Sequence, residues 1–263
     1  MDAATLIELY QSGDRNFSRQ DLSGIVLTGA TLRGINCTEG DLSGAVLDLA
    51  NLEEAELNLA NLMDATVSGS ILNFANLNGA MLQRAAMIGV TCEDAFLIEA
   101  DLSEAILSEA NFSRSFLTGA NLTRARMQRS RLSQAFLTGA SLNGANLSGA
   151  DLTAADLSRA NLTGANLTGA NLSRANLAGA KLNWANLTHA NLTDADLTGT
   201  YLVTMKGIYL GAVPLPPEPV LPSLQELEQL EQQMNRQPNQ SEPRQPVGPV
   251  EQVPDPAEDL GDP

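Results

Sequence analysis

The stretch Ala145–Arg174, ANLSGADLTAADLSRANLTGANLTGANLSR, repeats one five-residue unit six times, A-(N/D)-L-(S/T)-x. The same register extends outward, because an apolar residue stands at every fifth position from Phe17 to Leu202. These are 38 positions, of which 31 are Leu. Two residues before them, between Ala30 and Ala195, stands a small residue that is Ala at 28 of 34 sites. A period of five matches neither the 3.6 of an α-helix nor the 2 of a strand.

The five-residue period predicts a coil in which every unit contains a short strand-like segment and a turn. Residues two apart in an extended segment point to the same side, so the Ala and the Leu of each unit face inward. The other positions hold Asn, Asp, Ser, Thr and Gly, which favour turns. A large Leu beside a small Ala suits a narrow interior. In the regular stretch the core positions are Leu152, Leu157, Leu162, Leu167 and Leu172.

This pattern resembles the pentapeptide-repeat family, which is abundant in cyanobacteria, and the resemblance covers roughly 70% of the chain. It implies an all-β fold, a right-handed quadrilateral parallel β-helix in which four units make one turn and residues 20 apart stack. The period alone does not determine the number of sides. We expect the β-helix over residues 15–207. A solenoid exposes strand edges at its ends, so we expect a capping helix, Ala3–Gln11, within residues 1–14.

The C-terminal part, residues 208–263, differs in composition. All 12 prolines lie after residue 213, together with ten acidic residues and only two arginines, a composition typical of disorder. Ser223-Leu-Gln-Glu226 is a capping-box signature, and it predicts a short helix near residues 223–236. We expect a C-terminal cap followed by a Pro-rich acidic tail. This region could also mediate dimerisation.

Composition narrows the classes of function. A net charge of −16 disfavours direct binding of nucleic acid or of an anionic membrane. The acidic N-terminus is unlike a signal peptide and no apolar run approaches a membrane span, so we expect a cytoplasmic protein. Cys37 and Cys92 both take core positions on different faces, which predicts buried free thiols. With a single His beside them, metal and haem chemistry are disfavoured.

Charge is unevenly distributed along the repeats. Residues 1–110 have a net charge of −13, residues 111–213 one of +5 and residues 214–263 one of −8. The positive part contains a basic cluster that suggests nucleic-acid binding, namely Arg114, Arg124, Arg126, Arg129 and Arg131. Stacking at 20 residues instead predicts ion pairs, each worth ~0.2–1 kcal/mol. The expected pairs are Arg33–Glu53, Arg84–Asp64, Arg114–Asp94, Arg124–Glu104, Arg129–Glu109, Arg131–Asp151 and Arg174–Asp194. Arg126 alone in the cluster lacks an acidic neighbour.

Three phenylalanines form a second candidate site. Phe96, Phe116 and Phe136 are spaced by 20 and hold the position before the core Leu, which points outward in the family. They predict an exposed apolar strip along one face. Such a strip can serve as an interface. It can also stiffen the rod, since stacked aromatic side chains attract one another.

No group of residues offers a nucleophile with its base, a phosphate loop or a metal cluster, so we expect neither enzyme activity nor a cofactor. The main hypothesis is a protein-binding scaffold or adaptor. It would present Phe96, Phe116, Phe136 and Arg126 to a protein partner of unknown identity. A second hypothesis is an acidic DNA mimic, since some members of the family resemble duplex DNA and bind DNA gyrase. A third is a structural spacer or a self-associating rod.

Overall fold

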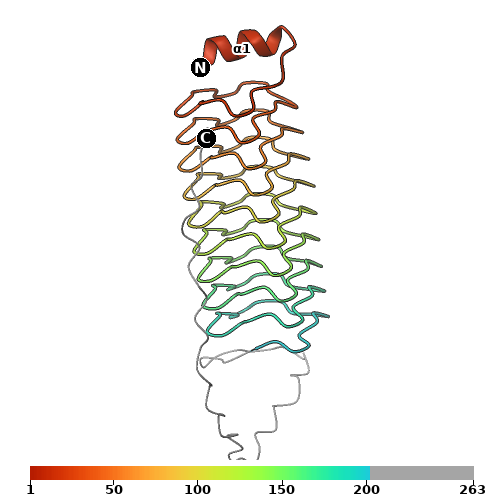
Figure 1. Ribbon diagram of the computed structural model, residues 1–263. Coiled ribbons are helices and arrows are strands. Elements are labelled where there is room, and N and C mark those ends of the chain that lie inside the picture. Colours follow the sequence, from red (N-terminus) through yellow and green to blue (C-terminus); the bar gives the residue numbers. More distant parts are fainter. Residues whose placement is uncertain (202–263) are drawn as a thin grey trace, which may run out of the picture. The chain divides into compact units, whose positions relative to one another are not determined.

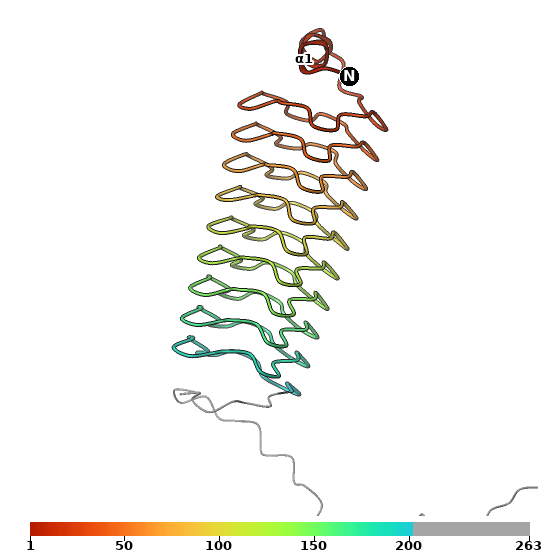
Figure 2. The same cartoon turned by 90° about the vertical axis from the view of Figure 1, so that its left-hand side faces the viewer.

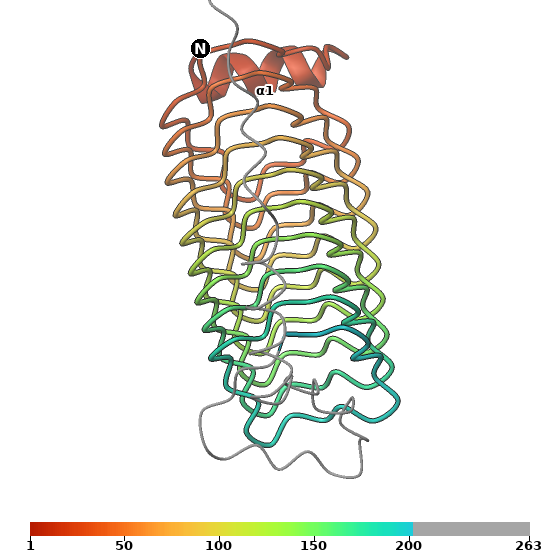
Figure 3. The same ribbon diagram turned by 60° about the horizontal axis from the view of Figure 1, so that its bottom comes forward.

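The computed structural model describes residues 1–201, a stack of coils preceded by one helix (Figure 1). Helix α1 spans Ala3–Gln11, as predicted. In the coils, every bridge is parallel and joins residues 20 apart, from Asn16↔Asn36 to Lys181↔Tyr201. Twenty residues are four units, so each coil has four faces. Figure 2 shows the regular stack from the side, and Figure 3 shows the four-sided outline of the coils.

The predicted boundary at residue 207, the C-terminal cap and the helix near residues 223–236 lie outside the described residues. Over residues 1–201, no helix is long and apolar enough to cross a membrane.

β-Bridges between coils involve one residue in five. Among residues 1–201 the structure contains isolated bridges and no strand of several residues, so the predicted parallel pairing is present but little of the chain forms regular strand. The reason is the turn, which occupies two residues of every unit. We name the five positions of a unit bridge, core, first-turn, corner and small. In one regular unit they are held by Asn161, Leu162, Thr163, Gly164 and Ala165.

Each regular unit satisfies all five of its backbone N–H groups. The bridge, core and corner residues donate to carbonyl groups of the adjacent coils, and the small residue donates to the core residue of its own turn. The first-turn residue donates to the side chain of the bridge residue, which explains why Asn and Asp prevail there. In the unit that begins at Asn161, the five acceptors lie at 2.8–3.2 Å and are Ala140 O, Lys181 O, Asn161 Oδ1, Asn183 O and Leu162 O.

The corner position has a left-handed backbone in every described unit. From Arg19 to Gly199, φ at this position lies between 55° and 69°. Together with the bond from the small residue to the core carbonyl, this is a β-turn whose third residue has positive φ, as in type II turns. Glycine suits it, but Arg, Glu, Asp and even Leu49 and Trp184 also occupy it.

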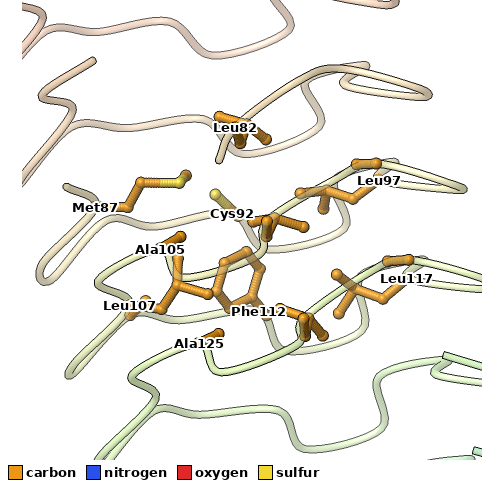
Figure 4. Packing of buried hydrophobic residues seen from close by; sticks show 14 of the residues in the cluster. Leu82, Met87, Cys92, Leu97, Ala105, Leu107, Phe112, Leu117 and Ala125 are labelled. Atoms are coloured by element: carbon orange, nitrogen blue, oxygen red, sulfur yellow. The ribbon is translucent and has the colours of Figure 1, made fainter. Parts of the chain in front are cut away.

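The core and small side chains fill the interior. The core residues Leu152, Leu157, Leu162, Leu167 and Leu172 are fully buried. Figure 4 shows Leu82, Met87, Cys92 and Leu97 of one coil directed inward beside Leu107, Phe112 and Leu117 of the next. Three buried serines replace Ala at the small position and remain hydrogen-bonded, because their hydroxyls donate to nearby backbone carbonyls. They are Ser70, Ser115 and Ser130.

The two cysteines are small core side chains that lie next to the two large core phenylalanines. Cys37 stacks on Phe17, and Cys92 stacks on Phe112, in each case at a spacing of 20 residues. Both thiols are buried and free, as predicted. Burial raises the pKa of Cys37 to about 12 and that of Cys92 further still, so neither forms a thiolate near neutral pH.

Helix α1 covers the first coil. Leu6 is fully buried, and Ile7 and Tyr10 pack against the same core. Tyr10 Oη donates a hydrogen bond to the carbonyl of Arg33 at 2.8 Å, and the amino group of Met1 donates to the carbonyl of Asp21 at 3.1 Å. These contacts close the apolar end of the solenoid, as its open interior requires.

Candidate partner-binding surfaces

The bridge position is where the candidate site residues depart from the repeat. An Asn or Asp there accepts the first-turn N–H, and this bond is lost wherever the bridge residue is apolar or basic. Among residues 1–201, the N–H groups of Thr118 and Thr138, which follow Phe116 and Phe136, have no protein acceptor. After Phe96 the N–H of Ile98 is satisfied by Asn78 Oδ1 of the preceding coil at 2.8 Å. These phenylalanines therefore do not accept the first-turn hydrogen bond that Asn or Asp accepts at the bridge position.

The three phenylalanines form one continuous ladder. Their rings are nearly parallel, with centroids 5.0 Å apart and an interplanar angle of 5° in both pairs. Phe96 and Phe136 remain 39% and 43% exposed, and Phe116 between them is partly buried. The predicted apolar strip is thus present on the outer face.

Three further apolar residues border the ladder, and sequence reasoning missed them. Ile98 is the first-turn residue of the unit that begins at Phe96. Leu59 is the corner residue of the equivalent unit two coils earlier. Phe74 is at the corner before Asn76, the residue that pairs with Phe96. Leu59 and Phe74 are 55% and 51% exposed. We call the six residues the phenylalanine face: Leu59, Phe74, Phe96, Ile98, Phe116 and Phe136.

The missed residues had a detectable signal. Apolar side chains at corner and first-turn positions break the polar rule of those positions, and the 20-residue register would have placed them beside the ladder. The sequence did not predict where the side chains of Leu59 and Phe74 point, because the left-handed backbone at the corner position was not anticipated.

Arg126 does not belong to the phenylalanine face. Each unit moves the chain to the next face, so Phe116 and Arg126, ten residues and two units apart, lie on opposite faces of the same solenoid. The structure therefore separates the residues that sequence reasoning had grouped into one partner-binding set.

Four of the seven predicted ion pairs form. Arg33, Arg84 and Arg114 each make two or more charge-assisted hydrogen bonds to carboxylates of a neighbouring coil. The fourth pair, Arg124–Glu104, is longer at 3.8 Å. Arg19 and Glu39 form a further pair that was not predicted. The hydrogen bonds and charge of Arg84 hold the pKa of Asp64 below its usual range.

Within the described part of the chain, the other three predicted pairs are absent: Arg129–Glu109, Arg131–Asp151 and Arg174–Asp194. The stem of Arg129 lies beside Gly149 of the next coil. Asp151 accepts hydrogen bonds from Thr153 and Asn171. All of these bonds end on Oδ1, so they engage one of the two carboxylate oxygens.

One hollow lies on the face that carries Arg131. This shallow hollow of about 390 Å³ is lined by Gly89, Thr91, Glu109, Asn111, Arg129 and Arg131. Among residues 1–201, no group of three or more His, Cys, Asp or Glu side chains is arranged to hold a metal ion.

Comparisons with known proteins identify relatives of the chain. The family model for pentapeptide repeats matches in eight copies, over segments that together run from residue 16 to residue 202. No curated protein matches the chain.

Solved structures agree with the family model. HetL, a pentapeptide repeat protein involved in heterocyst differentiation regulation from Nostoc sp. strain PCC 7120, is 36% identical. That match covers 77% of this chain and 95% of HetL, with a TM-score of 0.47. The plasmid-mediated fluoroquinolone resistance protein QnrB1 is 20% identical over 67% of this chain and 89% of its own, with a TM-score of 0.60.

A pentapeptide repeat protein from the Arabidopsis thaliana thylakoid lumen is 32% identical. That match covers 36% of this chain and 62% of the plant protein, with a TM-score of 0.19. The family match and the fold shared with QnrB1 imply a right-handed β-helix solenoid. By its repeats, its 20-residue stacking and these matches, the chain belongs to the pentapeptide repeat family.

Proposed function

We propose that the chain is a non-enzymatic protein-binding scaffold and that its partner binds the phenylalanine face. One observation carries the proposal: three stacked bridge positions hold phenylalanine, where Asn or Asp would have satisfied the turn. A sequence that breaks its own local rule at adjacent positions usually does so for function.

The flanking residues favour an interface over stiffening. Stacked rings do attract one another, by about 0.5–1.5 kcal/mol beyond their burial. That attraction explains the ladder but not Leu59, Phe74 and Ile98, which are exposed beside it and lie outside the stack. Exposed apolar side chains gathered around one face of a protein favour a binding site. The partner would therefore present a complementary apolar surface.

Capture from a lysate of the source organism tests the proposal. The full chain would be compared with the triple variant Phe96→Ser, Phe116→Ser and Phe136→Ser, and bound proteins would be quantified by mass spectrometry. Each truncated interface aromatic typically costs more than ~1 kcal/mol. We therefore expect the variant to lose a partner that the native chain retains, and to remain folded by circular dichroism.

The matched control is Val26→Ser, Val46→Ser and Ile106→Ser, which changes apolar bridge residues on the opposite face. It should retain the partner. A third variant, Glu39→Gln, Glu53→Gln and Glu56→Gln, addresses the DNA-mimic hypothesis with purified DNA gyrase. Gyrase binding that is lost in the Glu variant, together with unchanged capture by the Phe variant, would replace our proposal by the DNA-mimic hypothesis.

A further inference from the structure

Three arginines follow one another around a single coil, beginning on the face opposite the ladder. Arg126 lies on one face, Arg129 on the next corner and Arg131 on the next face, and all three are exposed. We call them the arginine arc. Arg126 faces away from the ladder, whereas Arg131 lies on the face next to it, so the arc and the phenylalanine ladder are two different surfaces of the same solenoid.

The arginines of the arc are unpaired, as are Arg159 and Arg174 among residues 1–201. Arg19, Arg33, Arg84 and Arg114 each donate at least two hydrogen bonds to carboxylates. In the part of the chain that the structure describes, the side chains of the arc make no hydrogen bond or ion pair. Three guanidinium groups are thus left with free donors on adjoining surfaces.

The arc also breaks the repeat's local rule. Arg126 and Arg131 hold bridge positions, so the N–H groups of Gln128 and Ser133 lack the side-chain acceptor that Asn or Asp would provide there. A basic surface that is merely solvated could be built without losing this hydrogen bond. Arginines at corner positions, such as Arg129, leave the bridge position free for Asn or Asp. Two of the three arginines are therefore placed at a cost to their own turns.

A hollow adjoins the arc. Its volume is about 390 Å³, and Arg129 and Arg131 line it together with Glu109 and Asn111. The stem of Arg129 lies beside Gly149, which has no side chain to compete for that space. The hollow can admit the side chain of a ligand between the two arginines.

We propose that the arginine arc binds a short acidic peptide segment of a partner protein. The planar guanidinium group matches a carboxylate through two parallel hydrogen bonds. From residue 126 to residue 131 the chain spans at most ~17 Å, which an extended peptide covers in about five residues.

A long nucleic acid does not suit this surface. Residues 1–110 carry a net charge of −13, and duplex DNA carries one negative charge per ~1.7 Å of its length. A duplex that extended beyond the arc would meet this acidic part of the solenoid.

Fluorescence anisotropy with labelled hexaglutamate and the full chain tests the inference, with labelled hexaglutamine as the uncharged probe. We expect the triple variant Arg126→Gln, Arg129→Gln and Arg131→Gln to weaken hexaglutamate binding roughly tenfold. The control Arg159→Gln, Arg174→Gln and Lys181→Gln removes three other positive charges and should change the affinity less than about twofold.

Three results would overturn the inference. Equal weakening by both variants would indicate general electrostatics, and no binding of hexaglutamate by the native chain would remove the ligand class. Tighter binding of a labelled 20-base-pair DNA duplex than of hexaglutamate would assign the arc to nucleic acid instead. Thermal unfolding by circular dichroism verifies that both variants remain folded.

Discussion

At the scale of single residues, volume is conserved across neighbouring coils. Each core phenylalanine stacks on a cysteine of the adjacent coil, and each cysteine follows a branched residue, Ile35 or Val90, that replaces the usual Ala. Interiors pack densely, so a ring in one layer requires less volume beside it. The cysteines are therefore packing residues, which agrees with their burial and their raised pKa values.

This packing predicts coupling between Cys92 and Phe112. Cys92→Leu overfills the layer above the ring and should cost about 1–3 kcal/mol of unfolding free energy. Phe112→Leu leaves a cavity and should cost about 1–2 kcal/mol. The double variant has Leu at both positions, as in the regular repeat, and should be at least ~1 kcal/mol more stable than the sum of the single changes predicts. Urea denaturation measures all three.

Phe17→Leu combined with Cys92→Leu is the control for this cycle. These two residues lie in well-separated coils and share no layer, so their effects should add within about 0.5 kcal/mol. If the effects of Cys92→Leu and Phe112→Leu on the unfolding free energy also added within about 0.5 kcal/mol, the size of one residue would not depend on the size of the other.

At the scale of the repeated turn, the left-handed corner is a source of strain. A left-handed backbone costs a residue with a Cβ roughly 1–2 kcal/mol, and glycine avoids this cost. Many corners nevertheless hold charged residues, whose side chains project outward where ion pairs between coils can form. A charged residue at the corner therefore strains its own backbone but can form an ion pair with a neighbouring coil.

Ala154 tests the strain without such surface chemistry. It lies at a corner with φ of 56°, and its side chain is a single exposed methyl group. Ala154→Gly should raise the unfolding free energy by about 0.5–1 kcal/mol, because relief of strain exceeds the entropy that glycine adds to the unfolded chain. Thermal and urea unfolding would quantify this gain.

The neighbouring small residue is the matched control. Ala155 is buried in the interior, so Ala155→Gly loses a packed methyl group and should lower the unfolding free energy by about 1 kcal/mol or more. The two identical substitutions should therefore have opposite signs. Destabilisation by both would mean that the corner is not strained.

At the scale of the whole molecule, register along the 20-residue coil determines stability. Each coil pairs with its neighbours through every bridge and every buried layer. Repeat proteins of this kind gain stability from the contact between successive repeats. A change in register therefore affects every coil that follows it, whereas a change in the number of whole coils does not.

Insertion of one residue after Gly164 would test this dependence. Beyond the insertion, Asn and Asp would enter core positions and Leu would move onto the turns, which should cost several kcal/mol. We expect a large fall in the melting temperature and rapid hydrogen exchange in the coils after residue 164.

Duplication of residues 145–164 is the control, since it adds twenty residues and one complete coil in register. It should keep or raise the melting temperature. If the one-residue insertion were tolerated as well as the duplication, local bulges would be absorbing shifts and register would not be the dominant constraint.

The sequence by itself determined the features that depend on neighbours within the chain. The five-residue period identified the inward Leu and Ala, and α1 followed from a short amphipathic stretch before the first repeat. Stacking at 20 residues came from the family resemblance and placed the phenylalanine ladder correctly. These features repeat identically, so each unit supports the same inference.

Only the tertiary structure showed where long side chains point and which hydrogen bonds their expected partners already accept. Arg129 and Arg131 make no ion pair with Glu109 and Asp151, although the 20-residue register stacks each pair, and Oδ1 of Asp151 instead accepts hydrogen bonds from its own turn. Spacing indicates which residues are neighbours, but it does not indicate where a long side chain points or which hydrogen bonds its partner already accepts. The opposite placement of Arg126 and the phenylalanines, by contrast, follows from the register, because two units separate Arg126 from Phe116 and from Phe136.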